Sequence, residues 1–170
     1  GTMSVGKTTL VNALKELEHF KDYNFATERS QHLMSLGIPL NTDSTLKGQT
    51  VFLAERCGEL MHDNIITDRT ILDVMAFTMN AKSIPYQDKE AFETYASEFI
   101  REYDYIFYIS PHGLEIEDNG VRETDEHYRD LIDFTITTLI KRHGHKAGAI
   151  EKISGSTEER IQQILNVTKL

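Results

Sequence analysis

Cysteine, tryptophan, proline and positive charge are all scarce in this chain of 170 residues. Its single cysteine, Cys57, cannot form an internal disulfide, which favours a reducing compartment, and we expect a cytoplasmic protein. No apolar run approaches the roughly 20 residues that a membrane-spanning helix needs, so we expect no membrane partner. The 18 Lys and Arg residues against 27 Asp and Glu give a net charge of −9. This charge argues against a protein that coats nucleic acid, because counterion release needs a basic surface.

What is present is a globular composition, with 39% hydrophobic and 26% charged residues. The length predicts a single domain over residues 1–170. Short β-rich runs alternate with longer amphipathic stretches, which predicts an α/β fold with a parallel sheet. Strands are expected at 23–27, 64–68, 103–109 and 149–153, and helices from residue 7 and over 46–61, 70–79, 88–102, 125–142 and 157–167.

The chain begins with Gly-Thr-Met-Ser-Val-Gly-Lys-Thr, which fits the phosphate-loop pattern G-x-x-x-x-G-K-[ST] in full. Gly1 and Gly6 permit backbone N–H groups to approach a polyphosphate closely. Lys7 supplies a charge to the β- and γ-phosphates, and the Thr8 hydroxyl is placed to ligate Mg²⁺. We therefore expect ATP and Mg²⁺ as cofactors. The residues expected to contact the nucleotide are Gly1, Met3, Ser4, Val5, Gly6, Lys7, Thr8 and Thr9.

The strand that should lead into this loop would lie before Gly1. In a doubly wound sheet that strand is central, and its omission would expose two neighbouring edges. We expect a short apolar strand upstream to complete a sheet of about five strands. Otherwise the fold is distorted or another chain fills the gap.

Acidic and basic residues follow two of the expected strands. Glu28 and Arg29 follow the first, and Asp68 and Arg69 stand at the end of the second. Because ligands of open α/β sheets bind at the carboxyl ends of strands, these residues are candidates for a phosphoryl-transfer site. Glu28 is the candidate general base, and Asp68 the candidate to support Mg²⁺ through water, although these two roles could be exchanged. Helix starts are the alternative interpretation of both pairs.

Two further arginines, Arg122 and Arg129, are seven positions apart and would share one helical face. The turn at 118–120 and its acidic surroundings predict a lid around 113–129 that swings Arg122 toward the phosphates. An exposed charged helix is the alternative.

Together these motifs resemble the P-loop nucleoside and nucleotide kinases, the group containing deoxynucleoside kinases, thymidylate kinases and nicotinamide riboside kinase domains. The resemblance implies a three-layer sandwich, in which helices flank a parallel sheet of about five strands, with an arginine-bearing lid. Asp68-Arg69-Thr70 is similar to the signature after the third strand of that family. Glu28 matches its general base, although Arg29 stands where the family usually has proline.

The resemblance also implies further contacts. Gly155 and Ser156 look like the loop beneath the adenine of ATP, and Gln49 falls where relatives use a glutamine to read a base. Arg122 would contact the nucleotide from the lid. The residues expected to bind the acceptor are Glu28, Arg29, Gln49, Arg69 and Arg129. The resemblance is also compatible with a homodimer.

The sequence thus favours an ATP-dependent kinase that transfers the γ-phosphoryl group to a hydroxyl or phosphate of a nucleoside or nucleotide. The expected catalytic residues are Lys7, Glu28, Asp68, Arg69 and Arg122. One alternative is a kinase acting on a polynucleotide or on a modified base in DNA, which needs only a local basic channel. Another is a P-loop regulatory ATPase with no small acceptor.

Overall fold

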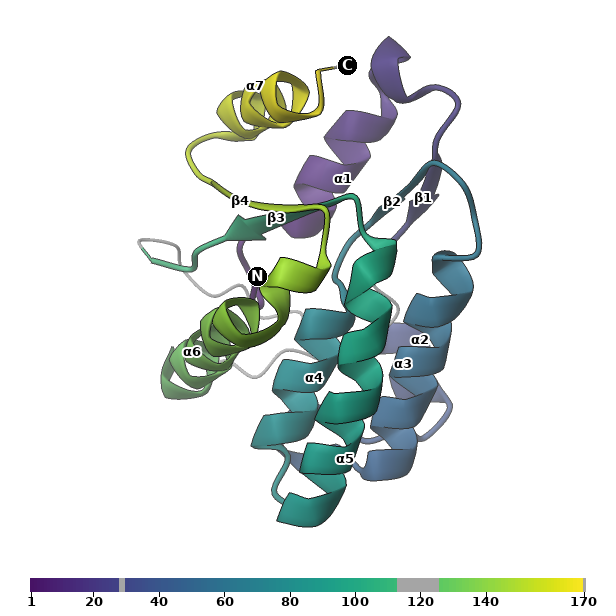
Figure 1. Cartoon of the computed structure of the whole chain (residues 1–170), viewed down its shortest axis with the longest axis vertical. Coiled ribbons are helices and arrows are strands. Elements are labelled where there is room, and N and C mark those ends of the chain that lie inside the picture. The colour runs from purple at the N-terminus through teal and green to yellow at the C-terminus, as the bar shows by residue number, and fades with distance from the viewer. Residues whose placement is uncertain (28–29, 113–125, 170) are drawn as a thin grey trace.

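The computed structural model describes residues 1–27, 30–112 and 126–169 (Figure 1). Its α-helices are α1 (Lys7–Lys15), α2 (Ser30–Ser35), α3 (Leu46–Glu59), α4 (Ile71–Asn80), α5 (Tyr86–Ala96), α6 (Glu126–His143) and α7 (Thr157–Thr168). Its strands are β1 (Asn24–Ala26), β2 (Ile65–Thr67), β3 (Tyr105–Ile109) and β4 (Ala149–Ile153). Short 3₁₀ helices cover Glu18–Phe20, Asn41–Asp43, Ser97–Glu102 and Gly144–Lys146. Within the described residues, no helix is long and apolar enough to cross a membrane.

The strands form two parallel pairs. In the first, Ala26 of β1 lies opposite Thr67 of β2, and in the second, Ile109 of β3 lies opposite Ile153 of β4. Since both pairs are parallel, the residues that follow their strands emerge at the carboxyl ends, where ligands of α/β sheets bind.

Side chains alternate along β3 between two hydrophobic cores. Ile106 and Tyr108 belong to a core built mainly with α4, α5 and α6, whereas Ile109 belongs to a second core with α1 and α7. Phe107 packs against this second core. Figure 1 shows the same division, with α1 and α7 on one side of the strands and α4 to α6 on the other. The strands are therefore covered on both faces, as expected for a three-layer sandwich.

A cavity of about 640 Å³ separates the two strand pairs. It is lined by β2 on one side and β3 on the other, with Leu10 and Leu14 of α1 and Ile136 of α6 among its apolar neighbours. Within the described part of the chain, β2 pairs only with β1 and β3 only with β4. The described residues thus contain four strands, and the fifth strand of the expected sheet stays a prediction.

Two elements differ from the sequence-based expectation. The helix expected over 88–102 is divided, because α5 ends at Ala96 and a 3₁₀ helix follows. At this junction the Ser97 hydroxyl donates a hydrogen bond to the Thr94 carbonyl, a local bond of the kind that competes with helical pairing. The short helix α2 was not expected, since six residues are too few to show a clear hydrophobic period.

Candidate active site

The phosphate-loop sequence begins at the carboxyl end of β3. A β-carbon on Gly1 would lie only 2.4 Å from the Ile109 carbonyl oxygen, so only glycine allows this close approach. Further along the loop, Ser4 and Gly6 adopt left-handed backbone conformations, with φ of 57° and 78°. Gly6 immediately precedes α1 and caps it. The sequence therefore forms a curled loop that ends at a helix N-terminus, as an anion site requires.

Two hydrophobic side chains anchor this loop. Met3 is buried in the core with α4 and α6, and Val5 in the core with α1 and α7. Because both side chains point into cores, these two residues can contribute only backbone groups to a nucleotide. Ser4, between them, is half-buried, and Thr9 is exposed on α1.

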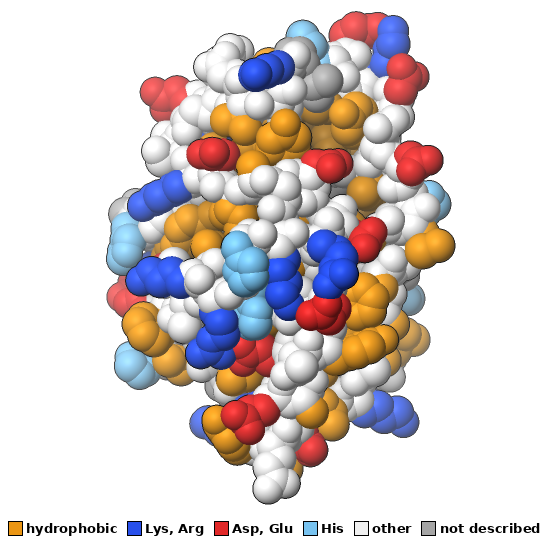
Figure 2. Space-filling view, viewed as in Figure 1, with side chains coloured by type: hydrophobic (Ala, Val, Ile, Leu, Met, Phe, Trp, Pro, Cys, Tyr) orange, Lys and Arg blue, Asp and Glu red, His pale blue; other side chains and the backbone are white. Residues whose placement is uncertain are grey.

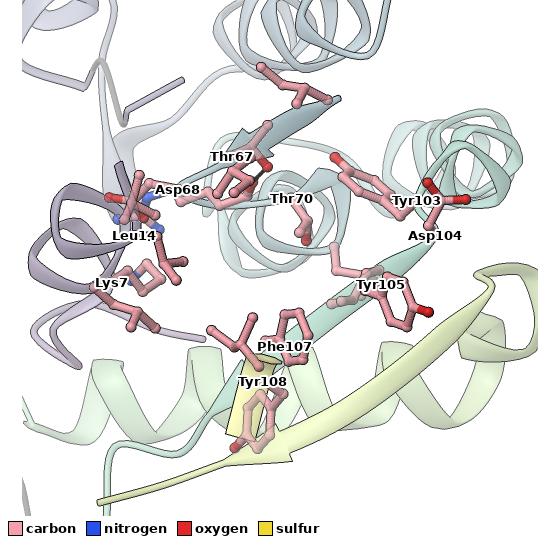
Figure 3. A pocket seen from close by; sticks show the side chains of 18 of the residues that line it. Lys7, Leu14, Thr67, Asp68, Thr70, Tyr103, Asp104, Tyr105, Phe107 and Tyr108 are labelled. Carbon is pink, nitrogen blue, oxygen red and sulfur yellow. Dashed lines mark hydrogen bonds between the residues drawn. The ribbon is translucent and has the colours of Figure 1, made fainter. Parts of the chain in front are cut away.

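The first turn of α1 carries two of the expected functional groups. The Lys7 ammonium donates a hydrogen bond to the Thr2 carbonyl inside the loop. The Thr8 hydroxyl donates a hydrogen bond to Oδ2 of Asp68, which follows β2 directly. Figure 3 shows Lys7 and Asp68 near one another at one end of the cavity, with Tyr103 and Asp104 at the other end. The structure thus brings together three residues that the sequence assigned to one site.

Two hydrogen bonds fix the backbone of Asp68. Its N–H donates to the Ala26 carbonyl at 2.8 Å, which extends the β1–β2 ladder, and its carbonyl accepts from Arg56 Nη1 at 3.1 Å. The side chain is 2% exposed, and Oδ1 is buried with no hydrogen-bond partner among the described residues. A buried carboxylate oxygen without a partner is unfavourable unless a cation satisfies it.

These donors fit a magnesium ion. Thr8 and Asp68 supply the hard oxygen atoms that Mg²⁺ prefers, and Mg²⁺ usually binds through one or two such side chains together with substrate phosphates and water. Among the described residues, no group of three or more His, Cys, Asp or Glu could hold a metal. Phosphate oxygens and water would complete the coordination, as they usually do for Mg²⁺.

Arg69 follows in a strained conformation, with φ of 85°. Its guanidinium lies over the Phe77 ring, 5.3 Å from the ring centroid, and Nη1 lies 4.0 Å from Asp73 Oδ1. Asp73 itself is fixed by a capping box, in which its Oδ2 accepts from the Thr70 N–H at 2.8 Å. Such strain persists where the surroundings hold it, and it is frequent at functional sites. Helix α4 thus holds Arg69, the residue after Asp68, at the wall of the cavity that Lys7 also lines.

The other expected contacts lie at different places in the fold. Gly155 has a φ of 91°, and the Ser156 hydroxyl accepts from the Glu159 N–H at 3.2 Å, so Ser156 caps α7. Gln49 is buried on α3, and Arg129 is buried on α6. Glu28, Arg29 and Arg122, together with lid residues 113–125, lie outside the described residues.

Two buried arginines were missed by the sequence analysis. Arg56 on α3 donates to the Asp68 carbonyl, and Arg160 on α7 donates to the Val5 carbonyl. Each occupies an apolar position of its helix: Arg56 lies three residues after the buried Leu53, and Arg160 four residues before the buried Ile164. A charged residue in line with a buried apolar residue of the same helix was the available signal.

Comparison with known families finds a match that includes the phosphate loop. Residues 1–160 match the family described as AAA domain. The chain belongs to this family. The matched region contains the whole phosphate loop, Asp68 and Arg69. A comparison with curated proteins finds no match.

Two solved structures of deoxyadenosine kinase from M. mycoides share the fold. The first, with bound dCTP, is 17% identical and has a TM-score of 0.68, and the match covers 99% of this chain and 96% of that chain. The second, with the products dCMP and a flexible dCDP, is also 17% identical, with a TM-score of 0.60 and coverage of 99% and 95%. The expected P-loop fold and the resemblance to P-loop nucleoside kinases are confirmed at the level of the fold.

Proposed function

We propose that this protein is an ATP-dependent kinase that phosphorylates a nucleoside or nucleotide. The observation that carries the proposal is the hydrogen bond between Thr8 and Asp68, which joins the phosphate loop to the carboxyl end of β2. Lys7 and Arg69 line the same cavity as Asp68, so two positive charges accompany the two oxygen donors. Positioning and charge stabilisation are what phosphoryl transfer requires from a protein.

In the proposed reaction, backbone N–H groups of the loop bind the phosphates and Lys7 neutralises charge on the γ-phosphate. Thr8 and Asp68 would hold Mg²⁺, which supplies further charge neutralisation on the phosphate oxygens. The acceptor oxygen forms a bond to the γ-phosphorus as the bond to the bridging oxygen breaks, and ADP leaves. We assign Glu28 to take the acceptor proton and Arg122 to close over the phosphates, on the resemblance alone.

A nucleoside or nucleotide is the favoured acceptor for two reasons. The similar solved structures are of deoxyadenosine kinase, with dCTP or with dCMP and dCDP bound. In addition, the net charge of −9 disfavours a large nucleic acid partner. Gln49, which the resemblance assigns to base reading, would then distinguish among bases.

The test is ADP release from Mg·ATP with deoxynucleosides, ribonucleosides, nucleoside monophosphates and single-stranded DNA, with the phosphorylated product identified by mass. We expect turnover that depends on a nucleoside or nucleotide, and a loss of about 10²–10³-fold in kcat for Lys7→Met. Lys15→Met, at the exposed end of the same helix, is the matched control. Equal ADP release without any acceptor would indicate a regulatory ATPase, and turnover with DNA alone a polynucleotide kinase.

A further inference from the structure

Arg160 of α7 is a buried charged residue whose side chain donates a hydrogen bond to the phosphate loop. It is 7% exposed, and its Nη1 donates a 2.7 Å hydrogen bond to the Val5 carbonyl, 155 positions away in sequence. Figure 1 shows α7 beside α1, on the side of the strands opposite α4 and α5. The bond therefore reaches from the last helix of the chain to the loop that precedes the first.

The geometry of a peptide unit gives this bond a consequence for the site. Peptide bonds are planar and trans, so the Val5 carbonyl and the Gly6 N–H, which share one peptide unit, point in opposite directions. Fixing the carbonyl toward Arg160 therefore also fixes the direction of the Gly6 N–H. Inward-pointing N–H groups are the means by which such a loop holds phosphate.

The space around this peptide is closely matched to Arg160. A β-carbon on Gly6 would lie 3.2 Å from Arg160 Nη1, and Gly6 has a φ of 78°, which also disfavours any other residue. A side chain at Gly6 would thus crowd the guanidinium, which would have to shift by a few tenths of an ångström.

Arg160 is in turn held by the start of α7. Its N–H donates to the Ser156 carbonyl at 3.0 Å, and Ser156 forms a capping box with Glu159. Arg160 therefore lies one helical turn from Gly155 and Ser156, the loop assigned by resemblance to the adenine of ATP. A rigid helical turn and one side chain connect the two segments expected to bind the nucleotide.

Packing alone is a poor explanation for this residue. The Arg160 Nε atom is buried with no hydrogen-bond partner among the described residues. A buried guanidinium with an unpaired N–H is unfavourable for stability, and an apolar side chain in its place would avoid that penalty. Retaining the charge is reasonable where the field and the donor serve a bound anion.

We propose that Arg160 is a positioning residue for the phosphate loop: it orients the Val5–Gly6 peptide for phosphate binding and couples this peptide to the loop at 155–156. The proposal rests on the proposed function only in requiring that the chain binds a nucleoside triphosphate. Arg160 acts through the backbone of Val5, without itself touching the phosphates.

The test compares Arg160→Met and Arg160→Lys with Ile164→Ala, which removes a buried side chain one turn along α7. Mg·ATP affinity is measured by calorimetry at a temperature where each variant is folded, and Tm is measured in parallel. We expect Arg160→Met to weaken ATP binding at least about tenfold. The loss of one charged hydrogen bond is enough for an effect of this size. Arg160→Lys should recover part of the affinity, because lysine keeps a charged donor. Ile164→Ala should lower Tm but leave affinity unchanged.

A second readout separates positioning from general loosening of the fold. Amide hydrogen exchange at Gly6, with and without Mg·ATP, should show protection on binding in the wild type and much less in Arg160→Met. ATP affinity in Arg160→Met equal to that in Ile164→Ala would overturn the proposal. If the wild type binds ATP but transfers no phosphoryl group, the proposed function fails while the role of Arg160 stands. If the wild type binds no nucleotide, both are wrong.

Discussion

The Thr8 hydroxyl and the Asp68 carboxylate form a hydrogen bond across 60 positions of sequence. Thr8 belongs to the first turn of α1, and Asp68 directly follows β2. Asp68 Oδ2 accepts this bond while Oδ1 stays buried without a partner among the described residues. The carboxylate therefore has one oxygen bonded within the protein and one whose burial a cation would compensate.

Asp68→Asn should preserve the fold but weaken the apparent affinity of the enzyme for Mg²⁺. The amide keeps an oxygen that can accept from Thr8, whereas the negative charge needed to support Mg²⁺ is lost. We expect the Mg²⁺ concentration for half-maximal turnover to rise about 10–100-fold, the usual effect of losing a supporting ligand. A magnesium titration of ADP release measures this. Asp63→Asn, an exposed neighbour before β2, should behave as wild type, and the same shift in both variants would show that Asp68 has no special role.

Phe77 should affect catalysis through Arg69. Its ring lies 5.3 Å from the guanidinium carbon, and a cation–π contact of this kind contributes about 0.5–2 kcal/mol. Phe77→Leu removes the contact, and we expect kcat/KM to fall by about 2–30-fold with ATP affinity little changed. Phe77→Tyr keeps an aromatic face and should retain most activity. Steady-state kinetics of the two variants decide the point: equal losses would mean that packing, not the contact with Arg69, is responsible.

The site was predictable where a local pattern carries the chemistry. The fixed positions of the phosphate loop, and Asp68 and Arg69 at the end of a strand, could be named because each motif is contiguous in sequence. Arg56 and Arg160 could not, because their roles depend on contacts with backbone carbonyls far away in the chain. Gln49 illustrates the same limit, since the sequence gives no sign that it is buried.

A second charged cluster lies outside the candidate site. Glu93 of α5 accepts hydrogen bonds from Arg142 Nη1 at 2.5 Å and pairs with His143 Nε2 at 2.8 Å, both at the end of α6. Figure 2 shows Lys, Arg and His side chains gathered on this face, where the last turn of α6 and the following 3₁₀ helix contribute Lys141, Arg142, His143, His145 and Lys146. Burial raises the pKa of Glu93, whereas the hydrogen bonds from His143 and Arg142 lower it. The lowering is the larger effect, so the pKa of Glu93 lies below its usual value.

This shift predicts a pH-dependent stability. A carboxyl with a lowered pKa in the folded state contributes stability above its unfolded pKa of about 4.3 and loses that contribution as pH falls through the folded value. Glu93→Gln should therefore lower the free energy of unfolding by about 1.5–3 kcal/mol at pH 7, with a smaller difference below pH 4. Urea unfolding of both proteins at several pH values tests this. A difference that stays constant down to acidic pH would exclude the ionised carboxyl as its source.

The cavity between the strand pairs is predicted to accommodate one additional strand. The facing edges of β2 and β3 carry backbone N–H and C=O groups that none of the described strands pairs, and apolar side chains surround them. An apolar segment of about five residues, added before Gly1, should form an extended strand between these edges, parallel to β2 and β3. It should raise Tm by more than about 4 °C relative to a Gly/Ser segment of equal length. Equal Tm values, measured by circular dichroism, would show that the cavity takes no strand.

Met3 and Val5, two residues apart in the phosphate loop, are buried in different hydrophobic cores. Unfolding either core would therefore displace the loop and, with it, the proposed nucleotide site. By mass action, a nucleotide at 100 times its Kd stabilises the folded state by about 2.7 kcal/mol. Because Met3 and Val5 anchor the loop in both cores, this stabilisation would extend to the helices on both sides of the strands. Bound nucleotide would thus make the two cores melt as one cooperative unit.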